Sequence, residues 1–265
     1  MKNLKVVFFL ATTTLLAGCH TQSRSISHSD YHGSGRGSDY AARSNGSDPG
    51  FEYRGELSEF DVLGITRGGV ASDTEIEQAL AKAKSVRLQR NSTILLVQSG
   101  AMFPDGPMVA ELSRYFRVVP FSGVPPVSQM PASGRFESGY AEGYSRSLRL
   151  AAARGGDDVI LCYWGILESE NAKLATKTVS WVPVMNWFVP DEKEHMRVRL
   201  KMALVDVRTG NWSVLSPAPV DDARLSTSPR RGVADRKLVE NLKQKAYATG
   251  AKELLRQYSD IALRN

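Results

Sequence analysis

The order of helical and strand-like segments predicts an α/β fold, in which helices pack on one mixed sheet. Helical apolar spacing alternates with short, continuous apolar runs between residues 72 and 164. Strand-like segments then follow one another from 177 to 215, and the longest apolar stripe of the chain occupies 235–263. Alternation favours parallel strands, whereas consecutive strands favour antiparallel pairing. We therefore expect three parallel-type βα units, an antiparallel hairpin group and a long C-terminal helix.

Composition places the chain among ordinary globular proteins. It has 265 residues, of which 42% are hydrophobic and 23% charged, and its mean hydropathy is -0.27. These values exclude collagen-like, mucin-like and polytopic membrane proteins. Two cysteines exclude a disulfide scaffold and a cysteine-rich metal module.

The first helix and strand of the domain have clear end signals. Ser72 and Glu75 form a capping box, whose hydroxyl and carboxylate can satisfy free amides of a first helical turn. Apolar residues at helical spacing continue this helix to about Arg90. The run Thr93–Val97 is apolar from Ile94 onward, which is typical of a strand covered on both faces.

Two more pairs of helix and strand follow. Pro107 fits the first turn of a helix, and strand character returns at Arg117–Phe121. A helix that begins near Phe136 carries aromatic and leucine side chains on one face. The apolar run Val159–Trp164 then predicts a second buried strand.

The remaining strands are predicted to be antiparallel. Met196–Val207 alternates apolar and charged side chains, so one of its faces is expected to be wet. Gly210 and Asn211 can supply the positive φ of a hairpin that continues into Trp212–Leu215. The polar stretch Ser216–Gly232 is interpreted as a loop before the last helix.

The N-terminus carries a targeting signal. Lys2 and Lys5 precede the apolar run Val6–Leu16, and Leu16–Cys19 reads Leu-Ala-Gly-Cys. This arrangement resembles the signal peptides of bacterial lipoproteins. The resemblance implies that residues 1–18 are removed and that Cys19 becomes a lipidated N-terminus carrying fatty-acyl chains such as palmitate. A chance match within an ordinary signal peptide is the alternative.

The residue after this cysteine and the stretch that follows it indicate where the domain sits. His20 is not an aspartate, so the resemblance implies the outer membrane, with the domain facing the periplasm. Residues 19–55 are rich in serine and glycine, and we interpret them as a flexible tether to a single α/β domain at 56–265. Ile26 is the only branched aliphatic residue from His20 to Arg54. A metal-binding tract is the alternative for the histidines there, which are His20, His28 and His32.

Short motifs in the domain resemble a family of bacterial envelope domains. The motif Leu204–Gly210 reads LVDVRTG, and the strand Ile94–Val97 and the passage Phe116–Phe121 add to the likeness. The family comprises the N-terminal domain of the Tol translocation protein, the curli secretion-channel lipoprotein and the lipoprotein activators of penicillin-binding proteins. The resemblance covers about residues 90 to 262 and implies this fold.

No catalytic, cofactor-binding or metal-binding residue is predicted. Cys162 lies in an apolar strand and is interpreted as an inert core thiol. His195 and Glu192 lie in a charged stretch that we interpret as a solvated turn, and Asp157 and Asp158 are also interpreted as turn residues. Removal of two lysines with the signal peptide lowers the net charge from +6 to +4, and no basic run indicates nucleic acid.

One apolar segment stands out from the rest of the strand-like region. Val179–Pro190 contains Trp181, Trp187 and Phe188, and Pro183 would interrupt a strand ladder there. Core packing is one interpretation. The other is that Trp181, Trp187 and Phe188 contact a partner or the membrane surface.

These observations favour a non-enzymatic, lipid-anchored interaction module that faces the periplasm and serves an envelope or cell-wall assembly. An envelope protein is the expected partner, together with the membrane through the lipid anchor. A lipoprotein hydrolase acting on cell-wall or peptide material and an oligomeric export-assembly component are the alternatives, and homo-oligomerisation is left open.

Overall fold

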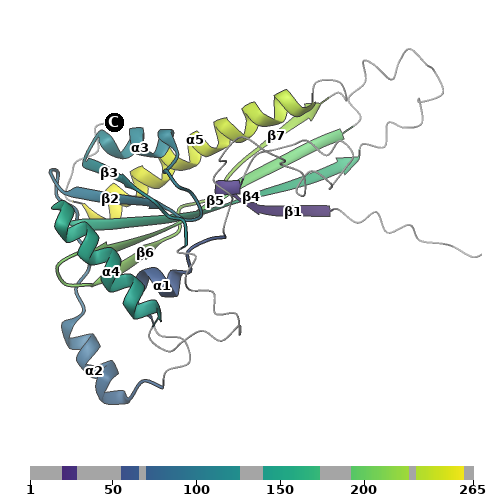
Figure 1. The fold of residues 1–265 in the computed structure, drawn as a ribbon. Helices are drawn as coiled ribbons and strands as arrows, with labels where there is room; N and C mark the ends of the chain where they lie inside the picture. Colours follow the sequence, from purple (N-terminus) through teal and green to yellow (C-terminus); the bar gives the residue numbers. More distant parts are fainter. Residues whose placement is uncertain are drawn as a thin grey trace, which may run out of the picture.

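The computed structural model describes residues 20–28, 55–65, 70–125, 140–173, 192–226 and 231–259. Within these ranges seven strands form one sheet, in the order β3-β2-β4-β5-β6, with β1 paired to β4 and β7 paired to β5 (Figure 1). The strands are β1 (His20–Ser25), β2 (Thr93–Gln98), β3 (Arg117–Phe121), β4 (Val159–Lys173), β5 (Glu192–Asp206), β6 (Trp212–Leu215) and β7 (Val220–Ser226).

The sheet is mixed. β2 runs parallel to both β3 and β4, whereas every other pairing is antiparallel. β4 and β5 are both 15 residues long and form the spine of the sheet. β2, β3 and β6 lie beside the end of this pair where β4 begins and β5 ends. β1 and β7 lie beside the other end, where β4 ends and β5 begins.

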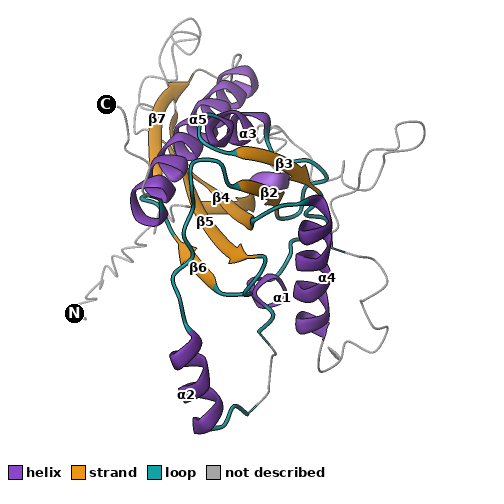
Figure 2. Ribbon diagram, turned by 90° about the vertical axis from the view of Figure 1, so that its left-hand side faces the viewer, coloured by secondary structure: helices purple, strands orange, loops and turns teal. Residues whose placement is uncertain are grey.

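Helices cover both faces of the sheet (Figure 2). On one face α3 (Gly106–Ser113) and α5 (Arg231–Tyr258) bury the larger apolar cluster. On the other face α1 (Glu59–Leu63) and α4 (Tyr140–Gly155) bury the smaller one. The fold class is confirmed, since three helix and strand pairs precede the antiparallel group and a long helix follows it.

The strand predictions succeed where apolar residues are continuous or alternate. In β2, Ile94, Leu96 and Val97 are fully buried, as expected of a strand covered on both faces. The hairpin between β5 and β6 is also confirmed, and Gly210 adopts the predicted positive φ of 76°. Leu238, Leu242 and Leu254 of the predicted C-terminal stripe are buried.

The helix after the capping box is shorter and less buried than predicted. The box itself is present, because Glu75 N–H donates to the Ser72 hydroxyl and the Glu75 carboxylate accepts from the Ser72 N–H. The helix, α2 (Asp73–Lys82), ends well before Arg90 and has no buried residue. It lies apart from the sheet in both ribbon views (Figures 1 and 2).

Two polar segments that were interpreted as irregular are strands. The stretch Ser216–Gly232 contains β7, which pairs with β5. His20–Ser25 forms β1 within the part interpreted as a tether, so the tether prediction is wrong over His20–His28. In both places pairing with a long neighbouring strand supplies partners for the backbone amides, and no apolar pattern is needed. Most of the predicted tether lies outside the described residues.

Candidate functional site

The N-terminal strand is built into the sheet beside β4, one of the two longest described strands. β1 pairs antiparallel with β4, from His20 opposite Asn171 to Ser25 opposite Ile166. The short 3-10 helix η1 (Ile26–His28) follows, and Ile26 is only 2% exposed. A Cβ added at Gly165 would lie 2.4 Å from Cδ1 of Ile26. Ile26 can therefore pack against β4 only because residue 165 has no side chain.

Polar contacts hold the same segment to three different elements. The Lys243 ammonium of α5 donates to the carbonyl oxygen of Ile26 at 2.9 Å. The Ser27 hydroxyl donates to the Ser99 carbonyl at 2.6 Å and accepts from the Gln98 amide at 3.0 Å. The segment is thus tied to α5 and to the end of β2 as well as to β4.

Asp105 is the centre of a polar cluster beneath this segment. Although Asp105 is the N-cap of α3, its carboxylate does not cap the helix. It accepts instead from Lys243 at 3.1 Å and from the Tyr247 hydroxyl, both on α5. The Asp105 N–H donates to Gln98 Oε1 at 2.7 Å, and the Tyr163 hydroxyl donates to the same oxygen at 2.5 Å.

The two tyrosines of this cluster remain protonated donors. Burial raises the pKa of Tyr163 and of Tyr247 well above the ordinary value, and the negative charge of Asp105 raises both further. Their rings are in an edge-to-face arrangement, with centroids 5.9 Å apart. The cluster therefore joins β2, β4, α3 and α5 through hydrogen bonds that the protein makes with itself.

Polar residues at the carboxyl end of β2 bond to other segments of the chain. In open α/β sheets this end is the usual place for a ligand. Here the Ser99 hydroxyl, directly after β2, accepts from the Leu57 N–H at 2.8 Å. The Trp164 indole donates to the Leu57 carbonyl at 2.7 Å. Leu57, before α1, and Ser27, after β1, therefore both make hydrogen bonds at the carboxyl end of β2.

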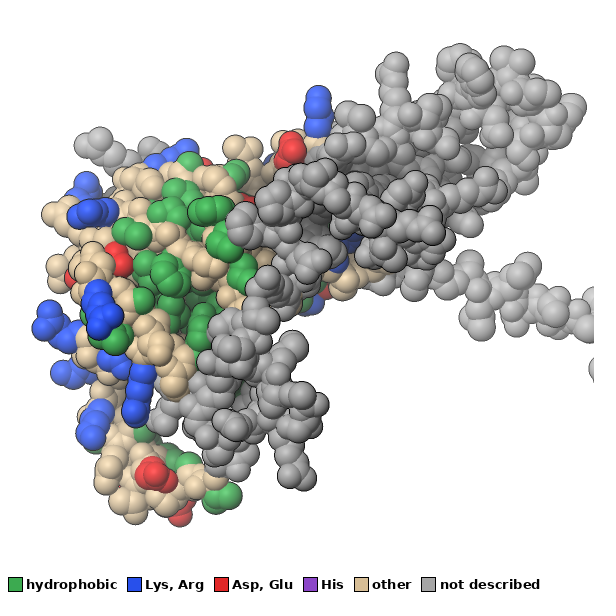
Figure 3. Space-filling view, viewed as in Figure 1, with side chains coloured by type: hydrophobic (Ala, Val, Ile, Leu, Met, Phe, Trp, Pro, Cys, Tyr) green, Lys and Arg blue, Asp and Glu red, His purple; other side chains and the backbone are tan. Residues whose placement is uncertain are grey.

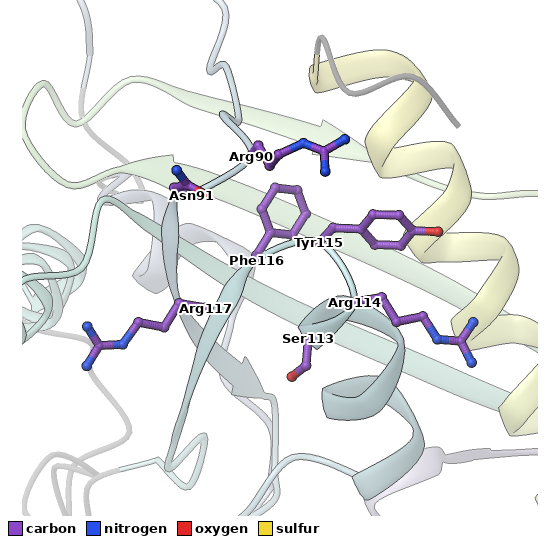
Figure 4. A pocket seen from close by; sticks show the side chains of 7 residues that line it. All are labelled: Arg90, Asn91, Ser113, Arg114, Tyr115, Phe116 and Arg117. Atoms are coloured by element: carbon purple, nitrogen blue, oxygen red, sulfur yellow. The ribbon is translucent and has the colours of Figure 1, made fainter. Parts of the chain in front are cut away.

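A pocket of about 530 Å³ lies at the opposite end of the sheet, where β2 and β3 begin (Figure 4). Phe116, 5% exposed, is its apolar residue, and Arg90 and Arg114 flank the ring of Tyr115. Arg117 points to the other side of Phe116. We call this the arginine pocket, and its lining residues are Arg90, Asn91, Ser113, Arg114, Tyr115, Phe116 and Arg117.

The arginine pocket carries more positive than negative charge. Arg114 forms an ion pair with Glu111 at 2.8 Å. Burial raises the pKa of the Asp157 carboxyl, and the positive charge of Arg117 opposes this shift. Lys and Arg side chains gather at the end of the molecule that lies away from β1 (Figure 3). This end can therefore attract an acidic group.

The structure tests some of the predicted site residues and leaves others aside. Cys162 is fully buried, and burial raises the pKa of its thiol, so the prediction that this cysteine lies in the core is confirmed. His195 is not in a turn, because β5 begins at Glu192, and its ring lies 3.3 Å from the Asp221 carboxylate. The lipidation candidate and the three aromatic candidates lie outside the described residues, and these are Cys19, Trp181, Trp187 and Phe188.

Two searches of the described residues give plain results. No group of three or more His, Cys, Asp or Glu residues there is arranged to hold a metal ion. Among the helices of the described ranges, none has the length and apolar character needed to cross a bilayer.

The arginine pocket was missed by sequence reasoning, although a signal existed. Asn91 precedes β2 and Arg117 begins β3, and the two strands are parallel. Parallel neighbours begin at the same edge of a sheet, so charged residues before and at their starts must lie together.

Comparison with known proteins identifies the family. Residues 58–257 match the family model described as YafT bacterial lipoprotein. The chain belongs to this family. This YafT-family protein is accordingly a lipid-anchored protein of the bacterial cell envelope. A search of curated proteins finds no match.

The solved structures that match include one that is similar over part of the chain. It is lipoprotein GNA1162 from Neisseria meningitidis, with 16% identity, a TM-score of 0.26, and coverage of 58% of this chain and 99% of that one. With such a TM-score this likeness carries no argument. The resemblance to the Tol, curli and penicillin-binding-protein activator domains stays a prediction.

Proposed function

We propose that this YafT-family protein is a non-enzymatic interaction module, anchored in the outer membrane through Cys19 and facing the periplasm. The observation that supports this role is that polar groups at the carboxyl end of β2 are hydrogen-bonded within the protein. Gln98, Ser99 and Asp105 stand where α/β proteins commonly bind substrates, but they bond to the protein's own segments. A partner that belongs to an envelope or cell-wall assembly would then bind to the outer surface of the domain.

The arginine pocket is the proposed contact with that partner. Arginine and tyrosine are enriched in interfaces, and Arg90 and Arg114 flank Tyr115 over the apolar Phe116. Arginine also binds carboxylates through two parallel hydrogen bonds. An acidic segment with an apolar side chain would match both properties of the pocket.

Crosslinking in living cells tests this contact. A photo-crosslinking amino acid at Ser113, an exposed pocket residue, should give an adduct with an envelope protein. The double change Arg90→Glu and Arg114→Glu should abolish the adduct because it reverses two charges of the pocket. Thermal melting should stay nearly unchanged, since both arginines are exposed.

A second crosslinker position controls for random collisions. Leu80 on α2 is 71% exposed, and α2 lies apart from the sheet. Crosslinking of the same protein from Leu80 with equal yield, or an adduct from Ser113 that survives the charge reversal, would rule out the arginine pocket as the contact.

Trp181, Trp187 and Phe188 are the proposed contact with the membrane. They belong to the segment that leaves β4 at Lys173 and enters β5 at Glu192, and this is the end of β4 where His20 pairs with Asn171. Since Cys19 precedes His20, the aromatic residues are connected to the anchored end of the sheet. Tryptophan favours the interface between membrane and water.

Replacing Trp181 and Trp187 with alanine should weaken association with the membrane without unfolding the domain. Both proteins are compared in a Cys19→Ser background, which lacks the proposed lipid. The double variant should bind phospholipid vesicles several-fold more weakly than the domain with both tryptophans. If the two tryptophans were buried in the core, each truncation would instead lower the free energy of unfolding by on the order of 3–5 kcal/mol. Loss of the cooperative thermal transition would therefore contradict the membrane contact.

A further inference from the structure

We propose that β1 holds the YafT-family protein upright on the bilayer, with the end of the sheet formed by β1, β4, β5 and β7 against the lipid head groups. This inference rests on the proposed acylation of Cys19 and adds the orientation of the domain. The partner of this surface is the phospholipid bilayer itself.

The distance between anchor and sheet is the first argument. Cys19 is joined to His20 by one peptide bond, and consecutive Cα atoms lie about 3.8 Å apart. His20 is already paired with Asn171. No free chain therefore separates the acylated residue from β1, and the domain cannot move away from the membrane while β1 stays paired.

The sheet presents four strands at the level of the anchor. His20 pairs with Asn171, Asn171 with Glu194, and Glu194 with Arg224. Neighbouring strands are about 4.8 Å apart, so this row extends about 14 Å from the anchored strand. All four strands thus have residues at the level of the anchor.

The docked segment resists being pulled out of the sheet. Besides six register pairs with β4, it buries Ile26 over Gly165 and is bonded by Lys243 and Gln98. A strand held by backbone pairing, core packing and side chains from two other elements acts as a rigid connection, whereas a free serine and glycine chain would act as a coil.

The arginine pocket is then carried far from the membrane. β4 begins at Val159, which pairs with Ile94 of β2, and β2 starts beside Arg117. From Asn171 back to Val159 the strand advances 12 residues (171 minus 159), which corresponds to about 40 Å at about 3.3 Å per residue. The lipid anchor and the pocket are therefore at opposite ends of the same strand.

Spin labels at two heights test the orientation. Arg197 and Arg208 are both exposed. Arg197 lies in β5, three residues from Glu194 at the level of the anchor, whereas Arg208 lies in the turn that follows the other end of β5 at Asp206. Each is changed to cysteine in the full, acylated protein, where native Cys162 is fully buried. The protein is placed in vesicles of phosphatidylethanolamine and phosphatidylglycerol with a small fraction of nickel-chelating lipid.

Relaxation of the nitroxide by the surface nickel should be several-fold greater for Arg197→Cys than for Arg208→Cys. A flexible linker of about twelve Gly and Ser residues, inserted between Cys19 and His20, adds a coil of about 20 Å and should remove most of that difference. Equal relaxation at both sites without the linker would overturn the upright orientation, whether the domain lies flat or hangs freely.

Mass spectrometry of the same samples separates the two proposals. A protein without acyl chains on Cys19 would refute the anchor, and with it the membrane attachment in the proposed function. An acylated protein with equal relaxation at both labels would refute only the orientation that is inferred from β1.

Discussion

Replacing Gly165 with valine should release β1 from the sheet and leave the rest of the domain folded. Even a Cβ at this position would lie 2.4 Å from Ile26 Cδ1, and valine adds two methyl groups beyond it. Overpacking of this kind costs about 1–3 kcal/mol, and expulsion of Ile26 forfeits about 1.5–3 kcal/mol of burial. Valine suits a central strand, so β4 itself should tolerate the change.

Hydrogen exchange measured by mass spectrometry distinguishes this local release from global unfolding. Amides of residues 20–27 should exchange much faster in Gly165→Val, whereas those of β2 and α5 should stay protected. Ile166→Val is the matched control, because residue 166 is 40% exposed and follows Gly165 directly. Unchanged exchange in β1 together with a lower melting temperature of the whole domain would contradict local release. It would mean that β1 unfolds only together with the rest of the domain.

Apolar patterning explains which elements could be predicted. β2 is a run of buried aliphatic residues, and β5 alternates buried Val198, Leu200 and Met202 with more exposed basic residues. These patterns are direct consequences of burial on two faces or on one, so they are visible in the sequence. The capping box before α2 was equally predictable, because it is made of contacts between residues three apart.

β1 and β7 could not be predicted because their stability comes from residues far away in the chain. β1 reads HTQSRS and β7 reads VDDARLS, with little apolar alternation. Each pairs with one long strand, whose backbone groups supply the hydrogen bonds. Ile26 was the one signal in the N-terminal stretch, since a lone branched aliphatic residue there has a reason to be buried.

The polar cluster around Asp105 was invisible for a related reason. Gln98, Asp105, Tyr163 and Lys243 belong to four different parts of the sequence, and nothing in their local context marks them as partners. The topology of the fold brings these residues together between the carboxyl end of β2 and α5. Sequence patterns report which face of an element is apolar, but they do not report which polar residues of different elements meet.

Replacing Asp105 with alanine should destabilise the domain more than any exposed ion-pair change. The carboxylate accepts from both Lys243 and Tyr247, and its loss leaves a mostly buried ammonium and a buried hydroxyl without this acceptor. Breaking a fully buried pair costs about 3–5 kcal/mol, but Asp105 and Lys243 keep 28% and 16% exposure, so we expect about 2–3 kcal/mol. Denaturant unfolding of both proteins measures the difference.

Glu253→Ala is the matched control for an exposed pair. Glu253 bonds Arg256 three residues along α5, and the two side chains are 30% and 70% exposed, so solvent screens the pair and the loss of stability should be much smaller. Because Lys243 also donates to the Ile26 carbonyl, Asp105→Ala should in addition speed exchange in β1. Equal destabilisation by the two variants would mean that the cluster is solvated like the surface and does not hold the anchor strand to α5.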